Sequence, residues 1–215
     1  MPKLIWEKKL KSYLKTKHLF KFKIDLFKLV IFSTMLISCY EFNLIARADN
    51  YGDYKNLKFY SYLDTRGEKI IDLVDRSQKV IFYPKENTPT CKSKNYWGYV
   101  TGAYKDTDGF FKSYLVICSN KIIRYTNKYY KNNLTEKLPY FINVTLNHEA
   151  LHSAQLCKSR PYFKPFGINN GYFSKSIRDK VYGSEVYAKN TPEDDLLEME
   201  AFYVEDKPYL VISYL

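Results

Sequence analysis

The sequence predicts an α+β fold in which a small antiparallel sheet packs beside a long helix, with two further helices after it. Three observations lead to this prediction: strand-like runs at 96–104 and 110–118, a sustained helical pattern at 135–157, and a strong helix start at Thr191. With 215 residues, 46% of them apolar, the chain can bury one sizeable core and is short for two. We therefore expect one folded domain, at residues 49–215.

The strands are predicted from runs of β-branched and aromatic residues. Residues 79–83 have this composition, and Pro84 should end the strand because it cannot donate a backbone hydrogen bond. The runs 96–104 and 110–118 are joined by Lys105-Asp106-Thr107-Asp108-Gly109, whose polar residues and glycine are typical of a hairpin.

The helices are predicted from apolar spacing and from their end signals. After the first helix, at 135–157, a stretch with two prolines and two glycines should be irregular, and residues 174–188 form a second helix. The third begins at Thr191-Pro192-Glu193-Asp194, which supplies a cap, a proline at the first helical position and acidic residues at the positive end of the dipole. It should continue until Pro208.

The first 48 residues have the order of an export signal. A basic stretch, Lys3–Lys28, precedes the apolar run Leu29–Tyr40, and the small residues of Ala46-Arg47-Ala48 fit a signal peptidase site. The apolar run is short, since a membrane span needs about 20 residues, so we expect cleavage after Ala48. A retained membrane anchor and lipidation of Cys39 are the alternatives. Each predicts an exported protein that is periplasmic, extracellular or attached to a membrane.

Charge and cysteine usage narrow the class of protein further. The formal net charge is +11, but residues 1–48 contribute +7 of it, so the folded part is only weakly basic. We therefore expect no nucleic acid as a partner. Beyond that segment three cysteines remain, and in an oxidising compartment Cys91 and Cys118 should pair because a hairpin can bring them together. Cys157 is then buried or paired between chains.

One pentapeptide within the predicted first helix carries the chemistry. His148 and His152 are four residues apart, so their imidazoles lie on the same helix face and can bind one zinc ion. Glu149 follows the first histidine and can act as the general base for a zinc-activated water. Beyond residue 48 the chain has no other histidine. The sequence therefore predicts Zn²⁺ as cofactor, with His148 and His152 as ligands and Glu149 as the catalytic residue.

A catalytic zinc usually has three protein ligands, and the third must be a different residue type here. Cys157 lies about a turn and a half beyond His152 and is too far along the helix. Glu200 and Glu198 in the third helix are the candidates. Glu200 is favoured, because its helical neighbours are apolar and a buried carboxylate needs a partner, whereas the surroundings of Glu198 are wetter.

The run 145–157, followed by Glu198-Met199-Glu200-Ala201-Phe202, resembles gluzincin-type zinc peptidases, most closely small exported bacterial zincin-like proteins. The resemblance implies a zincin-like fold and a metallopeptidase acting on peptide or protein substrates. It also implies that an edge strand, for which 110–118 is the candidate, aligns the extended substrate. One pattern within the resemblance places the ligand at Glu200 and another at Glu198. The aspartate that follows in each pattern is replaced here, by Val204 and Phe202 respectively.

Two other interpretations remain open at this point. The zinc could be structural and tie helices together without catalysis, as small exported domains often need such a staple. The chain could also be a membrane-tethered basic protein in which the motif is incidental. Glu149 argues for catalysis, because a structural site needs no general base. Several tyrosines could supply a phenol to stabilise an oxyanion, namely Tyr172, Tyr182, Tyr187 and Tyr203.

Overall fold

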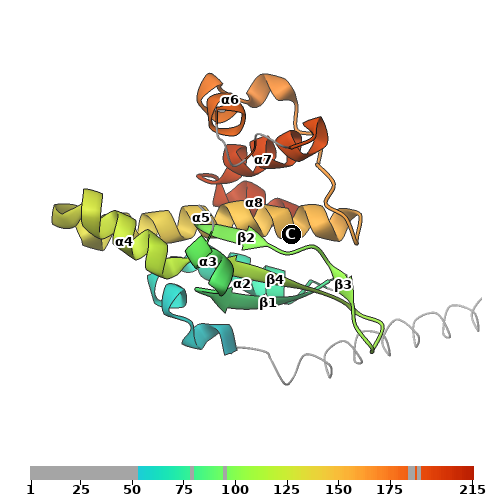
Figure 1. Ribbon diagram of the computed structural model, residues 1–215, viewed down its shortest axis with the longest axis horizontal. Coiled ribbons are helices and arrows are strands. Elements are labelled where there is room, and N and C mark those ends of the chain that lie inside the picture. Colours follow the sequence, from blue (N-terminus) through green and yellow to red (C-terminus); the bar gives the residue numbers. More distant parts are fainter. Residues whose placement is uncertain (1–52, 78–79, 94–95, 184–186, 188–189) are drawn as a thin grey trace, which may run out of the picture. The chain divides into compact units, whose positions relative to one another are not determined.

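The computed structural model describes most of the chain beyond the predicted export segment (Figure 1). The described part is residues 53–215 apart from short gaps at 78–79, 94–95, 184–186 and 188–189. The predicted signal or anchor at 1–48, with Cys39, lies outside it. No helix among the described residues is both long enough and apolar enough to cross a membrane.

The fold is α+β and is organised around one long helix, α5 (Leu134–Lys158). The sheet lies on one side of α5 and α7 packs on the other, with α6 beyond α7 (Figure 1). The other helices are α2 (Thr65–Asp75), α3 (Pro89–Ser93), α4 (Ser119–Tyr129), α6 (Lys175–Tyr182), α7 (Pro192–Val204) and α8 (Pro208–Tyr214). Short 3-10 turns lie at Asp53–Asn56, Lys58–Tyr62, Lys131–Asn133 and Asn170–Tyr172.

The sheet is mixed, which corrects the prediction of an antiparallel sheet. Its strands are β1 (Ile81–Glu86), β2 (Gly98–Val100), β3 (Tyr104–Lys105) and β4 (Phe111–Ile117). Strand β4 pairs with β2 and β3 in antiparallel fashion on one edge, which leaves its other edge for β1, and β1 runs parallel to it. Pro84 does not end β1 as predicted, because β1 is an edge strand where a missing N–H donor is tolerated.

The predicted edge strand, 110–118, is in fact the centre of the sheet. Both edges of β4 are paired, so neither can accept a further strand. Among the described residues β2 pairs only with β4, and it lies against α5. The strand edge nearest the motif helix therefore belongs to Gly98–Val100.

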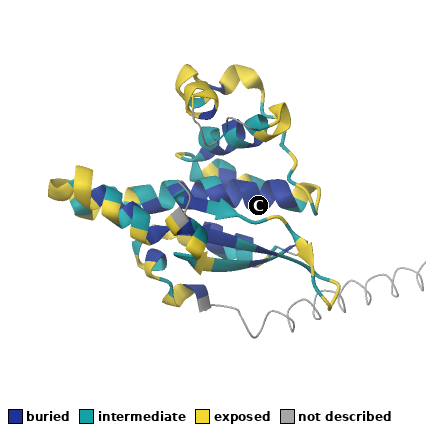
Figure 2. Ribbon diagram, in the orientation of Figure 1, coloured by how far each residue is buried: buried dark blue, intermediate teal, exposed yellow. Residues whose placement is uncertain are grey.

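The second half of α5 is buried on nearly all sides (Figure 2). From Thr145 to Leu156 every residue is buried except His148, which is half-buried. Six of these buried residues are polar: Thr145, Asn147, Glu149, His152, Ser153 and Gln155. A buried polar group is costly unless it finds a partner, so the elements that cover α5 must supply hydrogen bonds as well as apolar contacts.

Local end signals place α7 and α6 largely as predicted. Thr191 and Asp194 form a capping box, and α7 begins at Pro192. The side chain of Ser174 caps α6, which ends at Tyr182 and is shorter than predicted. Helix α7 also ends early, at Val204, and Pro208 starts the separate helix α8, which the sequence pattern did not distinguish.

The predicted disulfide between Cys91 and Cys118 is confirmed, with a Cα–Cα distance of 5.5 Å. It joins α3 to the residue that follows β4. Cys157 is half-buried, with its Sγ 2.9 Å from Ser77 Oγ.

Removing the disulfide should destabilise the fold. The bond closes a loop with a sequence separation of 27, and replacing both cysteines with alanine should lower the unfolding free energy by about 3–4 kcal/mol. Urea denaturation measures this loss, with Cys157→Ala as the control that leaves the bond intact. Peptide mapping under non-reducing conditions should find Cys91 linked to Cys118. Two free thiols at these positions in protein from an oxidising compartment would contradict the assignment.

Candidate metal centre

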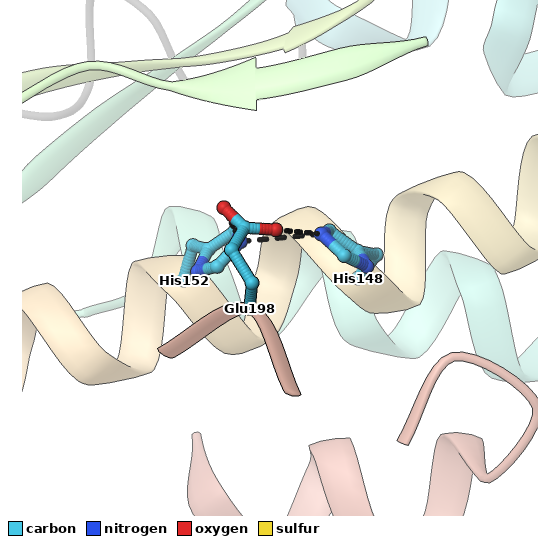
Figure 3. Close-up of side chains that lie close together, drawn as sticks. All are labelled: His148, His152 and Glu198. Carbon is cyan, nitrogen blue, oxygen red and sulfur yellow. Dashed lines mark hydrogen bonds and ion pairs between the residues drawn. The ribbon is translucent and has the colours of Figure 1, made fainter. Parts of the chain in front are cut away.

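His148 and His152 lie one turn apart on the face of α5 that is turned towards α7 (Figure 3). Their Nε2 atoms are 3.2 Å apart, and the ring planes are nearly perpendicular at 77°. His152 is buried, and His148 is half-buried. The helical spacing that suggested a ligand pair has therefore brought the two nitrogens to one point.

Glu198 on α7 completes a three-residue cluster with the two histidines (Figure 3). Its Oε2 is 3.4 Å from His148 Nε2, and its Oε1 is 3.6 Å from His152 Nε2. One ligand atom from each of the three residues lies within 4.8 Å of the others. The cluster thus joins α5 to α7.

The expectation that Glu200 lies beside the histidines is wrong. Two residues along a helix correspond to a rotation of about 200°, so Glu200 points away from the face of α7 that carries Glu198. The carboxylate of Glu200 is fully buried and accepts hydrogen bonds from backbone N–H groups of the connection between α5 and α6. A buried carboxylate does need partners, and those of Glu200 are these backbone N–H groups and the side-chain amide of Gln155. Cys157 is not part of the cluster either.

Glu149 is buried between α5 and strand β2. Its Oε2 accepts no hydrogen bond from the described residues. Gly98 allows this packing, because a Cβ on Gly98 would lie 2.7 Å from Glu149 Cγ and 2.9 Å from its Oε1. The same Cβ would lie 2.9 Å from the carbonyl oxygen of Val116 on β4. The strand can approach Glu149 this closely only because residue 98 has no side chain.

The electrostatics of the cluster favour bound positive charge. Burial raises the pKa of Glu149. Burial opposes protonation of His152, but the carboxylate of Glu198 outweighs it and raises the pKa of His152 to about 9. Burial likewise opposes ionisation of Glu198, yet the two imidazoles beside it hold its pKa well below the usual range. The site thus takes up protons to balance two buried carboxylates.

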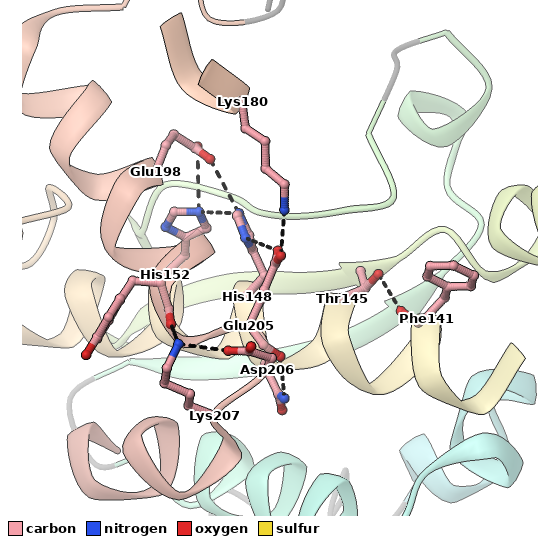
Figure 4. Close-up of polar contacts among 11 residues, drawn as sticks. Phe141, Thr145, His148, His152, Lys180, Glu198, Glu205, Asp206 and Lys207 are labelled. Atoms are coloured by element: carbon pink, nitrogen blue, oxygen red, sulfur yellow. Dashed lines mark hydrogen bonds and ion pairs between the residues drawn. The ribbon is translucent and has the colours of Figure 1, made fainter. Parts of the chain in front are cut away.

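The outer nitrogens of the histidines also have polar neighbours, and Figure 4 shows those of His148. His152 Nδ1 lies 2.7 Å from Gln155 Oε1. His148 Nδ1 lies 4.0 Å from Glu205 Oε2, and the other oxygen of that carboxylate accepts a 2.7 Å bond from Lys180 Nζ. Hydrogen bonds to the outer nitrogens fix the orientation of metal-binding imidazoles, so the contact with Gln155 helps to hold the ring of His152 in place. Glu205 is too far from His148 for a hydrogen bond and contributes only a nearby carboxylate.

Two adjoining hollows open onto the cluster, with volumes of about 500 and 350 Å³. Both are lined by Tyr96, Gly98, His148, Glu149 and Tyr187. The larger extends along α5 and gains an apolar wall from Trp97, Phe141, Val144 and Phe202. The smaller follows β2 and includes His152 and Glu198. The cluster is therefore reachable from the surface.

Comparison with known proteins identifies the family of the chain. A family model described as a domain of unknown function, DUF8637, matches residues 59–215. The chain belongs to this DUF8637 family. Neither the curated proteins nor the solved structures gave a match. The matched region contains α5, α7 and β2, so all residues of the cluster lie within the DUF8637 domain.

Three residues of this DUF8637 site were not predicted as site residues. Gln155 follows His152 by three residues on the same helix, so its spacing was a usable signal. Glu205 follows Glu198 by seven residues, which is two helical turns. Gly98 carried no local signal, because its role arises only when β2 packs on α5.

Adding a methyl group at Gly98 tests the packing of β2 on Glu149. The backbone carbonyl of Val116 cannot move away easily, so Gly98→Ala should lower the unfolding free energy by about 1–3 kcal/mol. Gly102→Ala is the matched control, because a Cβ there meets nothing within 4 Å. Urea denaturation of the two variants gives the comparison, and equal stabilities would show that β2 does not press on Glu149.

Proposed function

We propose that this chain is a zinc-dependent hydrolase, and that it is a metallopeptidase that cleaves peptide or protein substrates. One observation carries the proposal. His148 Nε2, His152 Nε2 and the carboxylate of Glu198 converge from two helices, with the buried carboxylate of Glu149 beside them.

The spacing of the cluster fits a zinc ion. Two ligands about 2.0–2.1 Å from a tetrahedral zinc are separated by roughly 3.3 Å. The nitrogen–nitrogen distance is 3.2 Å, and the two nitrogens lie 3.4 and 3.6 Å from different oxygens of the Glu198 carboxylate. Two histidines and one glutamate are also a ligand set of catalytic zinc sites, which keep a fourth position open. Oε2 of Glu149 and Oε2 of Glu198 are buried and accept no hydrogen bond from the described residues, which suits a site for a cation and a water molecule.

A zincin-like fold is part of the same proposal. The arrangement that supports it is a motif helix, α5, with a carboxylate ligand donated by the later helix α7 and an edge strand, β2, on the opposite side. Strand β2 lines the smaller hollow through Gly98, Tyr99 and Val100. An extended substrate would pair with its free edge, so β2 takes the role that the sequence assigned to 110–118.

The residues around the cluster have the properties that peptide hydrolysis requires. A zinc ion, when bound, would lower the pKa of a water molecule and polarise the substrate carbonyl. Glu149 takes the proton from the attacking water and passes it to the leaving amine. Its pKa is raised by burial, which suits a group that must both accept and donate a proton near neutral pH.

Of the four tyrosines predicted as candidates, Tyr187 is the best placed to stabilise the oxyanion. It lines both hollows beside Glu149, whereas Tyr172 and Tyr182 are exposed and Tyr203 packs against Phe173. Burial and the nearby Glu198 carboxylate raise the pKa of Tyr187, so its hydroxyl stays protonated and can donate a hydrogen bond.

A structural zinc site is the alternative proposal. Structural sites are usually closed by four protein ligands, but the described residues bring together only three. A structural site also does not require a buried carboxylate beside the ligands, whereas Glu149 lies there and lines both hollows. Catalysis therefore explains more of the geometry.

Export is also proposed. The Cys91–Cys118 disulfide supports an oxidising compartment, since such bonds are rare where thiols are kept reduced.

The metal content of the protein tests the zinc site. We expect about one zinc per chain after dialysis, measured by atomic absorption, and none in His148→Ala. In chelator competition Glu198→Gln should weaken zinc binding by more than about 100-fold, because it removes an anionic ligand. Glu193→Gln is the matched control, since this exposed glutamate lies on the same helix away from the cluster. A wild-type chain without zinc, or equal affinities for the two glutamate variants, would contradict the site.

Separating zinc binding from hydrolysis tests the catalytic assignment. Glu149→Gln should retain zinc but lose about 10²–10⁴-fold in hydrolysis, because an amide cannot accept the proton of water. Cleavage of an unstructured peptide mixture, followed by mass spectrometry, measures the rate. A variant that hydrolyses as fast as the wild type would exclude Glu149 as the base. A zinc-loaded wild type that cleaves nothing would favour the structural alternative.

A further inference from the structure

Glu200 accepts hydrogen bonds only, and it accepts four of them. Its Oε1 receives the backbone N–H groups of Gly167 and Ile168 at 2.6 and 2.9 Å. Its Oε2 receives the N–H of Phe166 at 2.8 Å and the side-chain amide of Gln155 at 2.9 Å. The carboxylate is fully buried, so these four donors define its surroundings.

These acceptors determine which way the amide of Gln155 points. Gln155 Nε2 carries two hydrogens, and it faces Glu200 Oε2 and also the backbone oxygen of Leu197, at 3.3 Å. Both of these groups can only accept. The opposite orientation would place the amide oxygen of Gln155 against two other oxygens in a buried site, which is strongly unfavourable. Oε1 of Gln155 must therefore face His152.

The orientation of Gln155 in turn fixes a proton on His152. An amide oxygen can only accept, so His152 Nδ1, which is 2.7 Å away, must be the donor. Because the Nδ1 proton is held in this hydrogen bond, the proton that His152 releases when a cation binds is the one on Nε2, and its loss frees the Nε2 lone pair. That nitrogen is the one that faces Glu198 and His148.

We propose that Glu200 is a positioning residue, which acts through Gln155 to keep the proton of His152 on Nδ1 and so leave Nε2 free for the metal. The inference rests on the proposed zinc site, but its hydrogen-bond chain exists without an ion. Glu200 thus has a role at the proposed metal site although it is not a ligand. It also connects the irregular segment 166–168 to the metal site, because the same carboxylate holds both.

Proton NMR of the full chain in chelator tests the hydrogen-bond chain itself. In the wild type the Nδ1 proton of His152 should exchange slowly with water, because the oxygen of Gln155 accepts it in a buried hydrogen bond. In Glu200→Gln the side chain of residue 155 is free to turn, and this protection should be lost. The inference is overturned if the Nδ1 proton exchanges rapidly in the wild type, or if Glu200→Gln leaves its protection unchanged.

A double-mutant cycle on zinc affinity tests whether Glu200 acts through Gln155. Glu200→Gln and Gln155→Met should each weaken zinc binding by about 10- to 100-fold, as is usual for groups that orient a ligand. The double variant should be no weaker than Gln155→Met alone, because the chain is already cut. Glu193→Gln should leave the affinity unchanged. Losses that add, or a Glu200→Gln variant with wild-type affinity, would mean that Glu200 only holds the 166–168 segment.

The inference remains testable if Glu200→Gln fails to fold and if the chain binds no zinc. If Glu200→Gln does not fold, Gln155→Met retains the contacts of Glu200 with the backbone, and wild-type zinc affinity in that variant would overturn the inference. Failure of the proposed function has a different signature, which is a wild-type chain that binds no zinc. The exchange of the His152 Nδ1 proton remains measurable in that case and tests the hydrogen-bond chain separately.

Discussion

The burial of polar side chains along α5 is the constraint on which the rest of the structure depends. A helix whose second half is covered on nearly all sides normally carries apolar residues there, yet this half carries two histidines, a glutamate and a glutamine. Each of these groups costs free energy unless a partner is supplied. The histidines and the glutamine find partners on α7, and the backbone of residues 166–168 in turn binds Glu200 of that helix. The covering elements are therefore placed by polar contacts as well as by apolar packing.

The features of the site that depend on neighbouring residues in the sequence could be predicted. The rotation of α7 about its own axis could not. The start of α7 follows from Thr191 and its neighbours, and the pairing of His148 with His152 follows from helical spacing. Which glutamate meets them depends on how α7 is rotated about its axis. That rotation is set when the backbone of residues 166–168 binds Glu200, a contact between segments far apart in sequence. The apolar neighbours of Glu200 on its helix therefore predicted that its carboxylate is buried, but they did not predict which group it binds.

The sheet shows the same limit. The hairpin residues 105–109 predicted the turn between β3 and β4, because turn chemistry is local. The position of β1 on the far edge of β4, and its parallel direction, depend on which edge the hairpin leaves free. The close approach of Gly98 to Glu149 depends on the final packing of β2 against α5. A single glycine gives no sign of such a contact in advance.

The site as built leaves two carboxylates close together in a buried place, which destabilises the fold unless positive charge balances them. Protons supply part of that charge, as the raised pKa of His152 and of Glu149 indicates. A divalent cation would supply more, and it would bind residues of both α5 and α7 at once. Its binding free energy would then add to the packing of these two helices, because the unfolded chain holds no such arrangement of ligands. On the proposed function, the ion that serves the chemistry would thus also hold together the two helices that position Glu149 and Glu198.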